Sequence, residues 1–315
     1  MSRAKDIARD LPSHKTDLQI LETLQEVRDS LRELDKKIPE SQDRTSTVQL
    51  EKNQFQTLER IRVITENSRM AALSPLRAAM KRRITDHQLG LVQTLHHLAE
   101  TGKSFSRFGD GEFRLMFRPE FDLRFQKNSA ALAADLREVL STPSEHTMLG
   151  LPHIFYDVHW STVLAELWHE LDATIPEGVV FGDAHVSRPP VFTINGQEGI
   201  DAWRAVWEGK NVAVVAGKGS RFDLIDPLFD NITSVQRIDS LPTNAYSDLG
   251  RVSEEVEKSG ADVVLVALGP AGTILSNRLA SSSRQVLDIG HLTASYRAVY
   301  EGASQPESRP LIARS

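Results

Sequence analysis

The sequence predicts an α/β protein of the doubly wound type, with a mostly parallel, Rossmann-like sheet preceded by N-terminal helical, coiled-coil-like segments. Two observations indicate the sheet. Beyond Gly102, short runs rich in β-branched residues alternate with longer amphipathic stretches, which is typical of strands and helices that follow one another in a parallel sheet. Residues 212–216 and 263–268 are almost continuously apolar, as expected of strands that helices cover on both faces.

Residues 1–85 are expected to form a helical region ahead of the sheet. Pro39 should end a first helix, and the polar residues 40–47 should form a linker. A second helix is expected from Val48 to about Met70, and a third after Pro75. The first helix carries a coiled-coil seam with alternating spacings of four and three: Ile20, Leu24, Val27, Leu31, Leu34 and Ile38. Because about three heptads are marginal alone, the seam should pair with a second copy, giving a homo-oligomer, or pack on the globular domain.

Residues 86–301 are expected to form the α/β domain, and residues 302–315 a flexible tail. The predicted strands are residues 105–108, 147–151, 179–182, 212–216, 235–238, 263–268 and 286–289. The predicted helices between them are residues 130–140, 158–171, 200–207, 249–258 and 272–281.

The composition excludes several classes of protein. The 315 residues include no cysteine, so a disulfide framework, a zinc ribbon, an iron–sulfur cluster and a cysteine nucleophile are ruled out. Any metal must therefore have oxygen or imidazole ligands. No apolar run approaches the ~18 residues of a membrane span, and no hydrophobic signal core follows Met1. The expected compartment is the cytoplasm.

The charge is unevenly distributed along the chain. Residues 1–85 carry 17 Lys and Arg against 13 Asp and Glu, a net charge of +4, whereas residues 86–315 carry 20 against 30, a net charge of −10. So acidic a domain repels a phosphate backbone, and nucleic acid is not an expected partner. The basic cluster at Arg77 and residues 81–83 is interpreted as a solvated helix face, with peripheral contact to a membrane or another anionic partner as the alternative.

The loop after the first predicted strand contains the sequence Arg107-Phe108-Gly109-Asp110-Gly111-Glu112. Ligands of doubly wound sheets bind at the carboxyl ends of the strands, and the two glycines let the backbone approach a ligand. Asp110 and Glu112 could hold Mg²⁺ or Mn²⁺, and Arg107 could bind phosphate through its planar fork. The alternative is an Asp-Gly turn before a helix, with Glu112 in its first turn.

Two later loops could bind an anion at a helix N-terminus. Residues 216–221 follow a buried strand and should open a helix, although they match neither a P-loop nor a dinucleotide fingerprint. Residues 268–273 should begin a helix at Pro270, and the alternative is a tight turn between strand and helix. His291, two residues after the last predicted strand, lies at the same edge of the sheet.

Three strings with these residues, in the same order, resemble the glycosyltransferase family of the GT-D fold, formerly a domain of unknown function. They are residues 104–113, 264–273 and 288–291, and the resemblance covers about residues 88–300. Residues 186–189, 215–217 with 220–221, and 242–246 support it. Residues 217–219 depart from the family pattern, which has an acidic residue after the strand.

This resemblance implies a metal-dependent transfer of a sugar, most simply a hexose, from a nucleotide-sugar donor to a hydroxyl of a glycan or glycoconjugate. Asp110 and Glu112 would be the catalytic residues and would hold Mn²⁺ or Mg²⁺, with His291 as a further ligand. The residues expected to contact the donor are Arg107, Phe108, Gly109, Gly111, Arg188, Ser220, Arg221, Asn244, Gly269 and Thr273.

The sequence does not single out the base that removes the proton from the hydroxyl of the acceptor substrate. Asp183, after another predicted strand, is a candidate, and a loop carboxylate without a catalytic role is the alternative. A second reading of the whole chain is a non-catalytic scaffold that binds nucleotide-sugar and assembles through its coiled coil. A dehydrogenase is disfavoured, because no complete Gly-x-Gly-x-x-Gly follows the early strand.

Overall fold

The computed structural model describes residues 25–26, 28–30, 32–33, 44–153, 158–220 and 222–304. The chain divides into two compact units, Met1–Ala79 and Met80–Ser315. All six residues of the expected coiled-coil seam, Arg221 and the expected tail from residue 305 onward lie outside the described residues.

The N-terminal unit contains one long helix, α3, which spans Arg44–Arg83 and continues beyond this unit. The break expected at Pro75 is wrong, because Pro75 lies inside the helix. Proline removes only one backbone donor, and strong helix formers surround it. The helix also begins inside the stretch between Glu40 and Thr47, which was expected to be a linker. On α3, Phe55 and Leu58 are 66% and 61% exposed.

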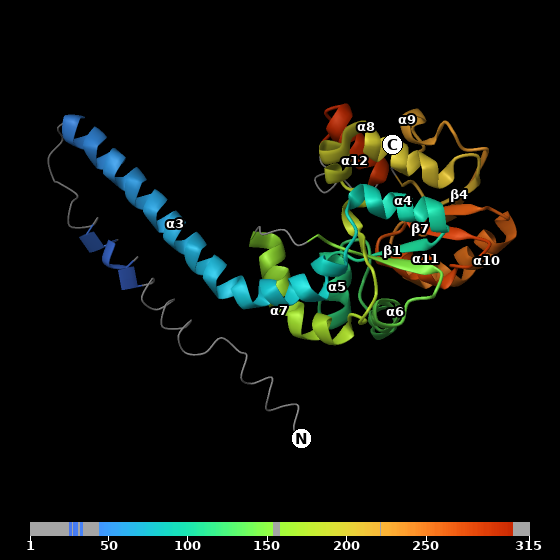
Figure 1. Ribbon diagram of the computed structural model, residues 1–315, viewed down its shortest axis with the longest axis horizontal. Helices are drawn as coiled ribbons and strands as arrows, with labels where there is room; N and C mark the ends of the chain where they lie inside the picture. Colours follow the sequence, from blue (N-terminus) through green and yellow to red (C-terminus); the bar gives the residue numbers. More distant parts are fainter. Residues whose placement is uncertain are drawn as a thin grey trace, which may run out of the picture. The chain divides into compact units, whose positions relative to one another are not determined.

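The second unit is built on a seven-stranded sheet in which all paired strands run parallel. The strands are β1 (Ser104–Arg107), β2 (Thr147–Leu151), β3 (Gly182–Asp183), β4 (Asn211–Gly217), β5 (Ser234–Ser240), β6 (Val263–Ala267) and β7 (Gln285–Asp288). Their order is β3-β2-β1-β7-β6-β4-β5 (Figure 1). This confirms the predicted doubly wound fold and all seven strands, although β3 is shorter than expected and begins later.

Helices cover both faces of this sheet (Figure 1). One layer holds α4 (Leu91–Thr101), α8 (Pro189–Trp207), α9 (Asp226–Phe229) and α12 (Leu292–Tyr300). The other layer holds α5 (Asp110–Phe117), α6 (Ala130–Ser141), α7 (Val158–Thr174), α10 (Leu249–Ser259) and α11 (Pro270–Arg278). Short 3-10 turns, η1 (Thr85–His87), η2 (Ala184–Ser187) and η3 (Ala245–Asp248), lie among them. Among the helices of the described residues, none has the length and apolar character needed to cross a membrane.

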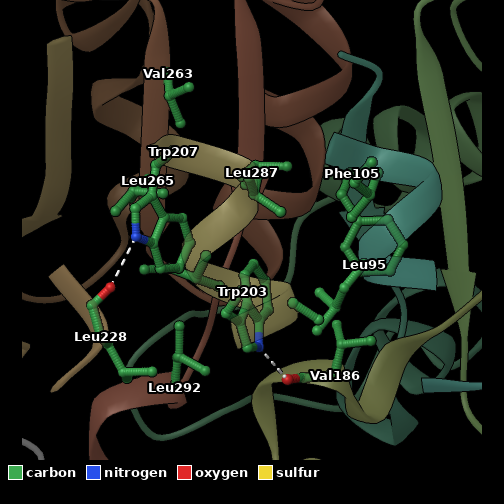
Figure 2. Close-up of a cluster of buried hydrophobic side chains, with 14 of the residues drawn as sticks. Leu95, Phe105, Val186, Trp203, Trp207, Leu228, Val263, Leu265, Leu287 and Leu292 are labelled. Carbon is green, nitrogen blue, oxygen red and sulfur yellow. Dashed lines mark hydrogen bonds between the residues drawn. The ribbon is translucent and has the colours of Figure 1, made fainter. Parts of the chain in front are cut away.

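The core of the first layer is built around two tryptophans of α8 (Figure 2). Trp203 and Trp207 are completely buried, and their rings stack with centroids 5.2 Å apart. Each indole N–H donates to a backbone carbonyl, that of Val186 at 2.7 Å and that of Leu228 at 2.8 Å. Because a buried indole N–H needs a partner, these bonds fix the segments after β3 and β4 against α8.

Candidate functional site

A cavity of about 450 Å³ opens at the carboxyl edge of the sheet. Loops that follow β1, β3, β4, β5, β6 and β7 line it, together with parts of the segment after α5 and of α7. The residues expected at the site that do line it are Arg107, Phe108, Gly109, Asp110, Gly111, Glu112, Arg188, Ser220, Gly269 and His291. The fold thus brings together residues that lie up to 184 positions apart in the chain.

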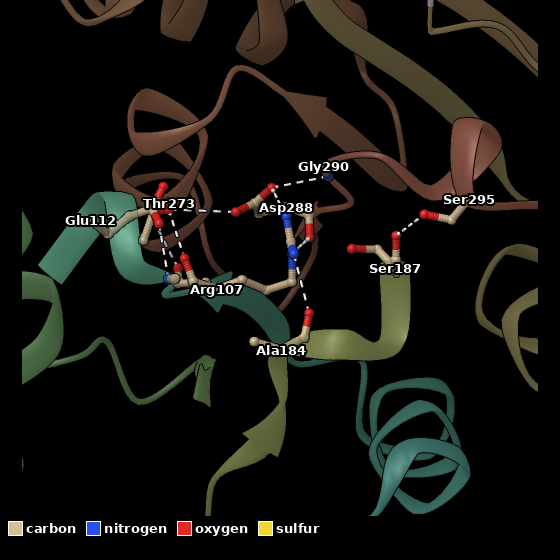
Figure 3. Close-up of polar contacts among 10 residues, drawn as sticks. Arg107, Glu112, Ala184, Ser187, Thr273, Asp288, Gly290 and Ser295 are labelled. Carbon is tan, nitrogen blue, oxygen red and sulfur yellow. Dashed lines mark hydrogen bonds and ion pairs between the residues drawn. The ribbon is translucent and has the colours of Figure 1, made fainter. Parts of the chain in front are cut away.

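Arg107, at the end of β1, is bound mainly by the protein itself (Figure 3). Its Nε donates to the backbone O of Asp288 at 2.7 Å, and its Nη2 to Oδ1 of Asp288 at 3.0 Å. Its Nη1 donates to the backbone O of Ala184 at 3.1 Å. These bonds use three of the five N–H groups of the guanidinium, so Arg107 acts as a strut between β1, β7 and the segment after β3.

Glu112 lies in the first turn of α5, with its side chain at the cavity. Its Oε2 accepts a hydrogen bond from the backbone N of Gly109 at 2.8 Å, which caps the helix. Burial, followed by the neighbouring carboxylate of Asp288, raises the pKa of Glu112 to about 7. The position of Glu112 in the first turn of a helix, which the sequence offered as the alternative, is therefore confirmed. A ligand role is compatible with it, because the other oxygen does not take part in the cap.

Asp288, which ends β7, is the carboxylate that the sequence interpretation missed. Its side chain is 3% exposed. Oδ1 accepts from Arg107 and from the backbone N of Gly290 at 3.2 Å, and Thr273 Oγ1 lies 3.4 Å from Oδ2. A Cβ at Gly290, where φ is +46°, would overlap the Arg107 guanidinium. The available signal was a carboxylate at the end of a predicted buried strand, three residues before His291.

Asp110 is the first residue of α5, and its side chain is 41% exposed. Its Oδ2 lies 3.3 Å from Nε2 of His159 on α7. Within the part of the chain that the structure describes, no three His, Asp or Glu side chains form a ready metal-binding group. Asp110, Glu112, Asp288 and His291 nevertheless all line the same cavity, and Mg²⁺ sites commonly use one or two carboxylates with water and substrate phosphates.

Thr273 does not line the cavity, contrary to the expectation that it contacts the donor. It is fully buried in α11, where its Oγ1 donates to the backbone O of Arg107 at 2.8 Å. Its own backbone O accepts from Ser106 Oγ at 2.9 Å. Thr273 therefore joins α11 to β1, behind the cavity wall.

Gly269 lines the cavity just before α11, which begins at Pro270 as predicted. Its φ of +57° is in the region that favours glycine, and a Cβ there would lie 2.7 Å from the Phe125 ring. The amides of Gly272 and Thr273 donate to the backbone O of Gly269. Those two amides are thus used within the turn and do not face a ligand.

Asn244 does not line the cavity either, although it was expected to contact the donor. Its φ of +54° and ψ of +41° place it in the left-handed region. Its backbone N donates to the O of Phe125 at 2.7 Å, and its Oδ1 accepts from the N of Lys127 at 2.9 Å. Asn244 thereby holds the segment whose Leu123 and Phe125 form one wall of the cavity.

The loop after β4 does not open a helix, which corrects that expectation. Ser220 N donates to the O of Gly217 in a tight turn, and Gly219 has a φ of +73°. The amide of Lys218 extends the pairing with β5 by donating to the O of Ser240. The next helix, α9, begins only at Asp226. This loop offers the cavity the exposed side chain of Lys218, which was not among the expected residues.

Comparison with known proteins decides the family. A family model described as "Glycosyltransferase GT-D fold" matches residues 105–308. The chain belongs to the GT-D glycosyltransferase family. The resemblance found in the sequence is thereby confirmed.

Two curated relatives from streptococci carry related names. The chain is 28% identical over 227 residues to "Glycosyltransferase GlyD" of Streptococcus pneumoniae serotype 4 (strain ATCC BAA-334 / TIGR4), a match that covers 68% of this chain and 28% of that protein. It is 30% identical over 229 residues to "Probable glycosyl transferase Gly" of Streptococcus gordonii, covering 69% of this chain and 33% of that protein. The match thus spans a third or less of each relative.

Solved structures of the GT-D family have the same architecture. One, described as "The highly conserved domain of unknown function 1792 has a distinct glycosyltransferase fold", matches with a TM-score of 0.63 and 25% identity, covering 72% of this chain and 86% of that one. "A New Glycosyltransferase (DUF1792) from Streptococcus sanguinis" matches with a TM-score of 0.60 and 28% identity, covering 69% and 86% of the two chains.

Proposed function

We propose that this GT-D protein transfers a sugar, most simply a hexose, from a nucleotide-sugar donor to a hydroxyl of a glycan or glycoconjugate, with the help of Mn²⁺ or Mg²⁺. The observation that carries the proposal is that two carboxylates line one cavity, Glu112 on the helix that follows β1 and Asp288 at the end of the adjacent strand β7. Two carboxylates in a partly buried site repel each other when both are charged. A divalent cation relieves this repulsion.

The residues present fit such a cation, since all are oxygen or imidazole ligands. Asp110, Glu112 and His291 would hold it, with Asp288 beside Glu112. When bound, the cation would neutralise the charge that develops on the departing diphosphate. The carboxylates themselves bind and orient, and the cap bond from Gly109 fixes the backbone of the first turn of α5.

Positive side chains at the cavity supply the remaining charge for a diphosphate. Lys218 and Arg188 line the cavity at the ends of different strands, and Arg124 lies on the wall formed by the segment after α5. We assign donor phosphate contact to Lys218 and Arg188, beside Arg107, whose guanidinium also binds Asp288 and Ala184. Apolar side chains near Lys218, those of Phe222, Leu241 and Pro242, offer a wall for a nucleobase.

The test is a screen of UDP-, GDP- and dTDP-hexoses for release of the nucleoside diphosphate, with Mn²⁺, Mg²⁺ or EDTA. We expect turnover with one donor class that EDTA abolishes. Glu112→Gln keeps the cap acceptor and should lower turnover more than about 100-fold, as the loss of a group that stabilises developing charge can do. The matched control, Glu120→Gln, changes an exposed glutamate just after α5 and should turn over normally.

Two results would contradict the proposal. Normal turnover in Glu112→Gln, or turnover that EDTA leaves unchanged, would remove the metal-assisted mechanism. Donor binding in calorimetry without turnover for any donor and acceptor would favour the non-catalytic scaffold.

A further inference from the structure

A histidine and an aspartate form a pair at the β3 end of the cavity, apart from Asp110, Glu112 and Asp288, which are called the acidic cluster below. Nδ1 of His185 lies 3.0 Å from Oδ1 of Asp183, and the two side chains are 13% and 8% exposed. Asp183 ends β3, and His185 follows in the short turn η2. His185 lines the cavity, whereas Asp183 does not.

Asp183 is held firmly behind the histidine. Its Oδ1 also accepts a hydrogen bond from the backbone N of His185 at 2.8 Å. Its own backbone N donates to Oγ1 of Thr94 at 3.0 Å. The carboxylate that the sequence suggested as a proton acceptor is therefore turned away from a substrate. The imidazole that it orients faces the cavity in its place.

The contacts at Nδ1 bear on which ring nitrogen carries the proton in the neutral imidazole, and we assign it from the shorter one. Two acceptor atoms 3.0 Å apart would repel each other, so a proton lies between Nδ1 and Asp183 Oδ1. The backbone N–H of His153 lies 3.3 Å from Nδ1 and could donate to it only in the other tautomer, so the assignment rests on the shorter contact to the carboxylate. With the proton on Nδ1, Nε2 has a lone pair and can accept a proton. This is the orienting role that an aspartate has in a catalytic triad.

The position of the pair along the sheet separates it from the phosphate-binding end. β3 lies at one edge of the sheet and β5 at the other, with β1 and β7 between them. His185 lies at the end of β3, the acidic cluster at the ends of β1 and β7, and Lys218 with Leu241 at the ends of β4 and β5. A donor whose nucleotide lies near β4 and β5 would place its sugar near the acidic cluster. The next space along the edge is the one beside His185.

We propose that His185, oriented by Asp183, accepts the proton of the acceptor hydroxyl, and that the indole of Trp160 forms one wall of the subsite for a carbohydrate acceptor. This inference rests on the proposed function. Trp160 also lines the cavity, and its ring meets that of His185 edge to face, with centroids 6.3 Å apart and an angle of 76°. Aromatic rings of this kind can pack against the C–H face of a sugar.

The step balances as follows. The acceptor oxygen forms a bond to the anomeric carbon of the donor sugar, and the bond from that carbon to the diphosphate oxygen breaks. The nucleoside diphosphate leaves with the electron pair of that bond, and the proton of the acceptor hydroxyl moves to Nε2 of His185. Release of this proton to water restores the neutral ring.

Several charged and titratable groups surround His185. Asp183 lies on the same turn, and Arg188 follows it on the cavity wall. From β1, the Arg107 guanidinium binds the neighbouring carbonyl of Ala184. His153 approaches from the end of β2, and on α7 His159 lies beside Trp160 and pairs with Asp110. The pH profile of a His185 variant must therefore be compared with profiles of variants at these neighbours.

The experiment uses the full chain and five variants, two of which, His159→Gln and His153→Gln, change the neighbouring histidines. His185→Gln removes the base, Asp183→Asn keeps an acceptor for the His185 amide but removes the charge that orients the ring, and His146→Gln is the matched control at the amino-terminal end of β2. Transfer from UDP-, GDP- and dTDP-hexoses to free monosaccharides and nitrophenyl glycosides is measured between pH 5 and 9. Binding of UDP, GDP and dTDP is measured by calorimetry, and folding by thermal melts.

We expect His185→Gln to lower the transfer rate about 100-fold or more, with nucleotide affinity unchanged within threefold. The fall in rate on the acid side of the profile should disappear, and added imidazole should restore part of the rate. Asp183→Asn should lower the rate and shift the pH at which the rate falls on the acid side. The His159→Gln and His153→Gln variants should show this fall at the same pH as the wild type.

A rate within threefold of wild type in His185→Gln would overturn the inference. The inference would also be overturned if His185→Gln lost both transfer and nucleotide binding and imidazole did not restore transfer, because that pattern indicates a structural role. If the wild-type chain transfers no sugar from any donor, the proposed function itself fails, and this inference fails with it. Transfer in the wild type together with normal transfer in His185→Gln leaves the function standing and removes only His185.

Discussion

At the scale of single residues, Glu112 serves the fold and the site at once. Its Oε2 caps α5, while burial and Asp288 raise its pKa to about 7. A charged Glu112 is therefore unfavourable in the folded chain unless a cation is present. The side chain that caps α5 is thus also one whose charged form a bound cation would stabilise.

The raised pKa of Glu112 predicts how the free energy of unfolding changes with pH in metal-free protein with EDTA. Below about pH 4 the Glu112 carboxyl is protonated in both states. As pH rises through the ordinary range for glutamate, the unfolded chain releases the proton first, so the folded chain loses stability until about pH 7, where the loss becomes constant. Glu112→Gln should escape this loss, which is at most about 3 kcal/mol, and should melt higher than wild type at pH 8.

Thermal melts of Glu112→Gln, wild type and the exposed control Glu120→Gln at pH 4 and pH 8 check this prediction. The gap between Glu112→Gln and wild type should widen with pH, and the control should show no such change. An equal gap at both pH values would contradict the raised pKa of Glu112.

Gly269 gives a second prediction at this scale. The sequence left two readings, a ligand-facing turn or a purely structural one, and the φ of +57° with the close Phe125 ring favours a stability cost. We expect Gly269→Ala to lower the free energy of unfolding by about 1 to 3 kcal/mol, since both backbone strain and overlap contribute. Gly250→Ala, in helix α10 with open space around it, should not. Urea unfolding measures both, and equal stability of the two variants would show that the turn tolerates a side chain.

At the scale of elements, local patterns predicted what is locally determined. The apolar runs at residues 212–216 and 263–268 became β4 and β6, because a strand covered on both faces needs such a run. The continuous course of α3 through Pro75 was not predicted, since a single proline signals a helix end more often than a tolerated interruption. Contacts such as Arg107 with Asp288, 181 positions apart, have no local signal and depended on the strand order.

Helix α3 carries a prediction about self-association. Phe55 and Leu58 lie on neighbouring positions of one helical face and are both more than half exposed. We propose that this face pairs with a second copy of the chain. Phe55→Glu with Leu58→Glu should lower the particle mass in light scattering, because like charges would meet across the interface. Asn53→Glu with Gln56→Glu adds the same charge on the opposite face and should leave the mass unchanged. An unchanged mass in both double variants would exclude pairing through this face.

At the scale of the whole α/β unit, the two halves of the sheet meet where β1 lies beside β7. Their backbone register contains one residue pair, Phe105 with Leu287, whereas β4 and β5 pair over seven residues. Side chains reinforce this junction: Arg107 binds Asp288, Thr273 binds the Arg107 carbonyl, and Ser104 Oγ accepts from Val286 N at 2.8 Å. The candidate site therefore lies on a junction that side chains reinforce.

A double-mutant cycle tests the strut. Arg107→Met should lower the free energy of unfolding by about 3 to 5 kcal/mol, because it leaves the buried Asp288 without its countercharge. Arg107→Met with Asp288→Asn should recover part of this loss, since the uncompensated charge is gone. Denaturant unfolding of both single variants and the double variant gives the coupling energy. Additive effects of the two substitutions would show that the ion pair does not hold the junction.

The distance of 181 positions between Arg107 and Asp288 has a consequence for synthesis of the chain. β1 emerges from the ribosome early and can pair with β2 soon afterwards, but its other neighbour, β7, is among the last parts of the unit to be made. Until then the Arg107 guanidinium lacks its carboxylate partner, and Glu112 lacks the neighbour that raises its pKa. A growing chain thus carries no finished cavity, and nucleotide and metal ion meet a complete site only when the unit has been translated almost to its end.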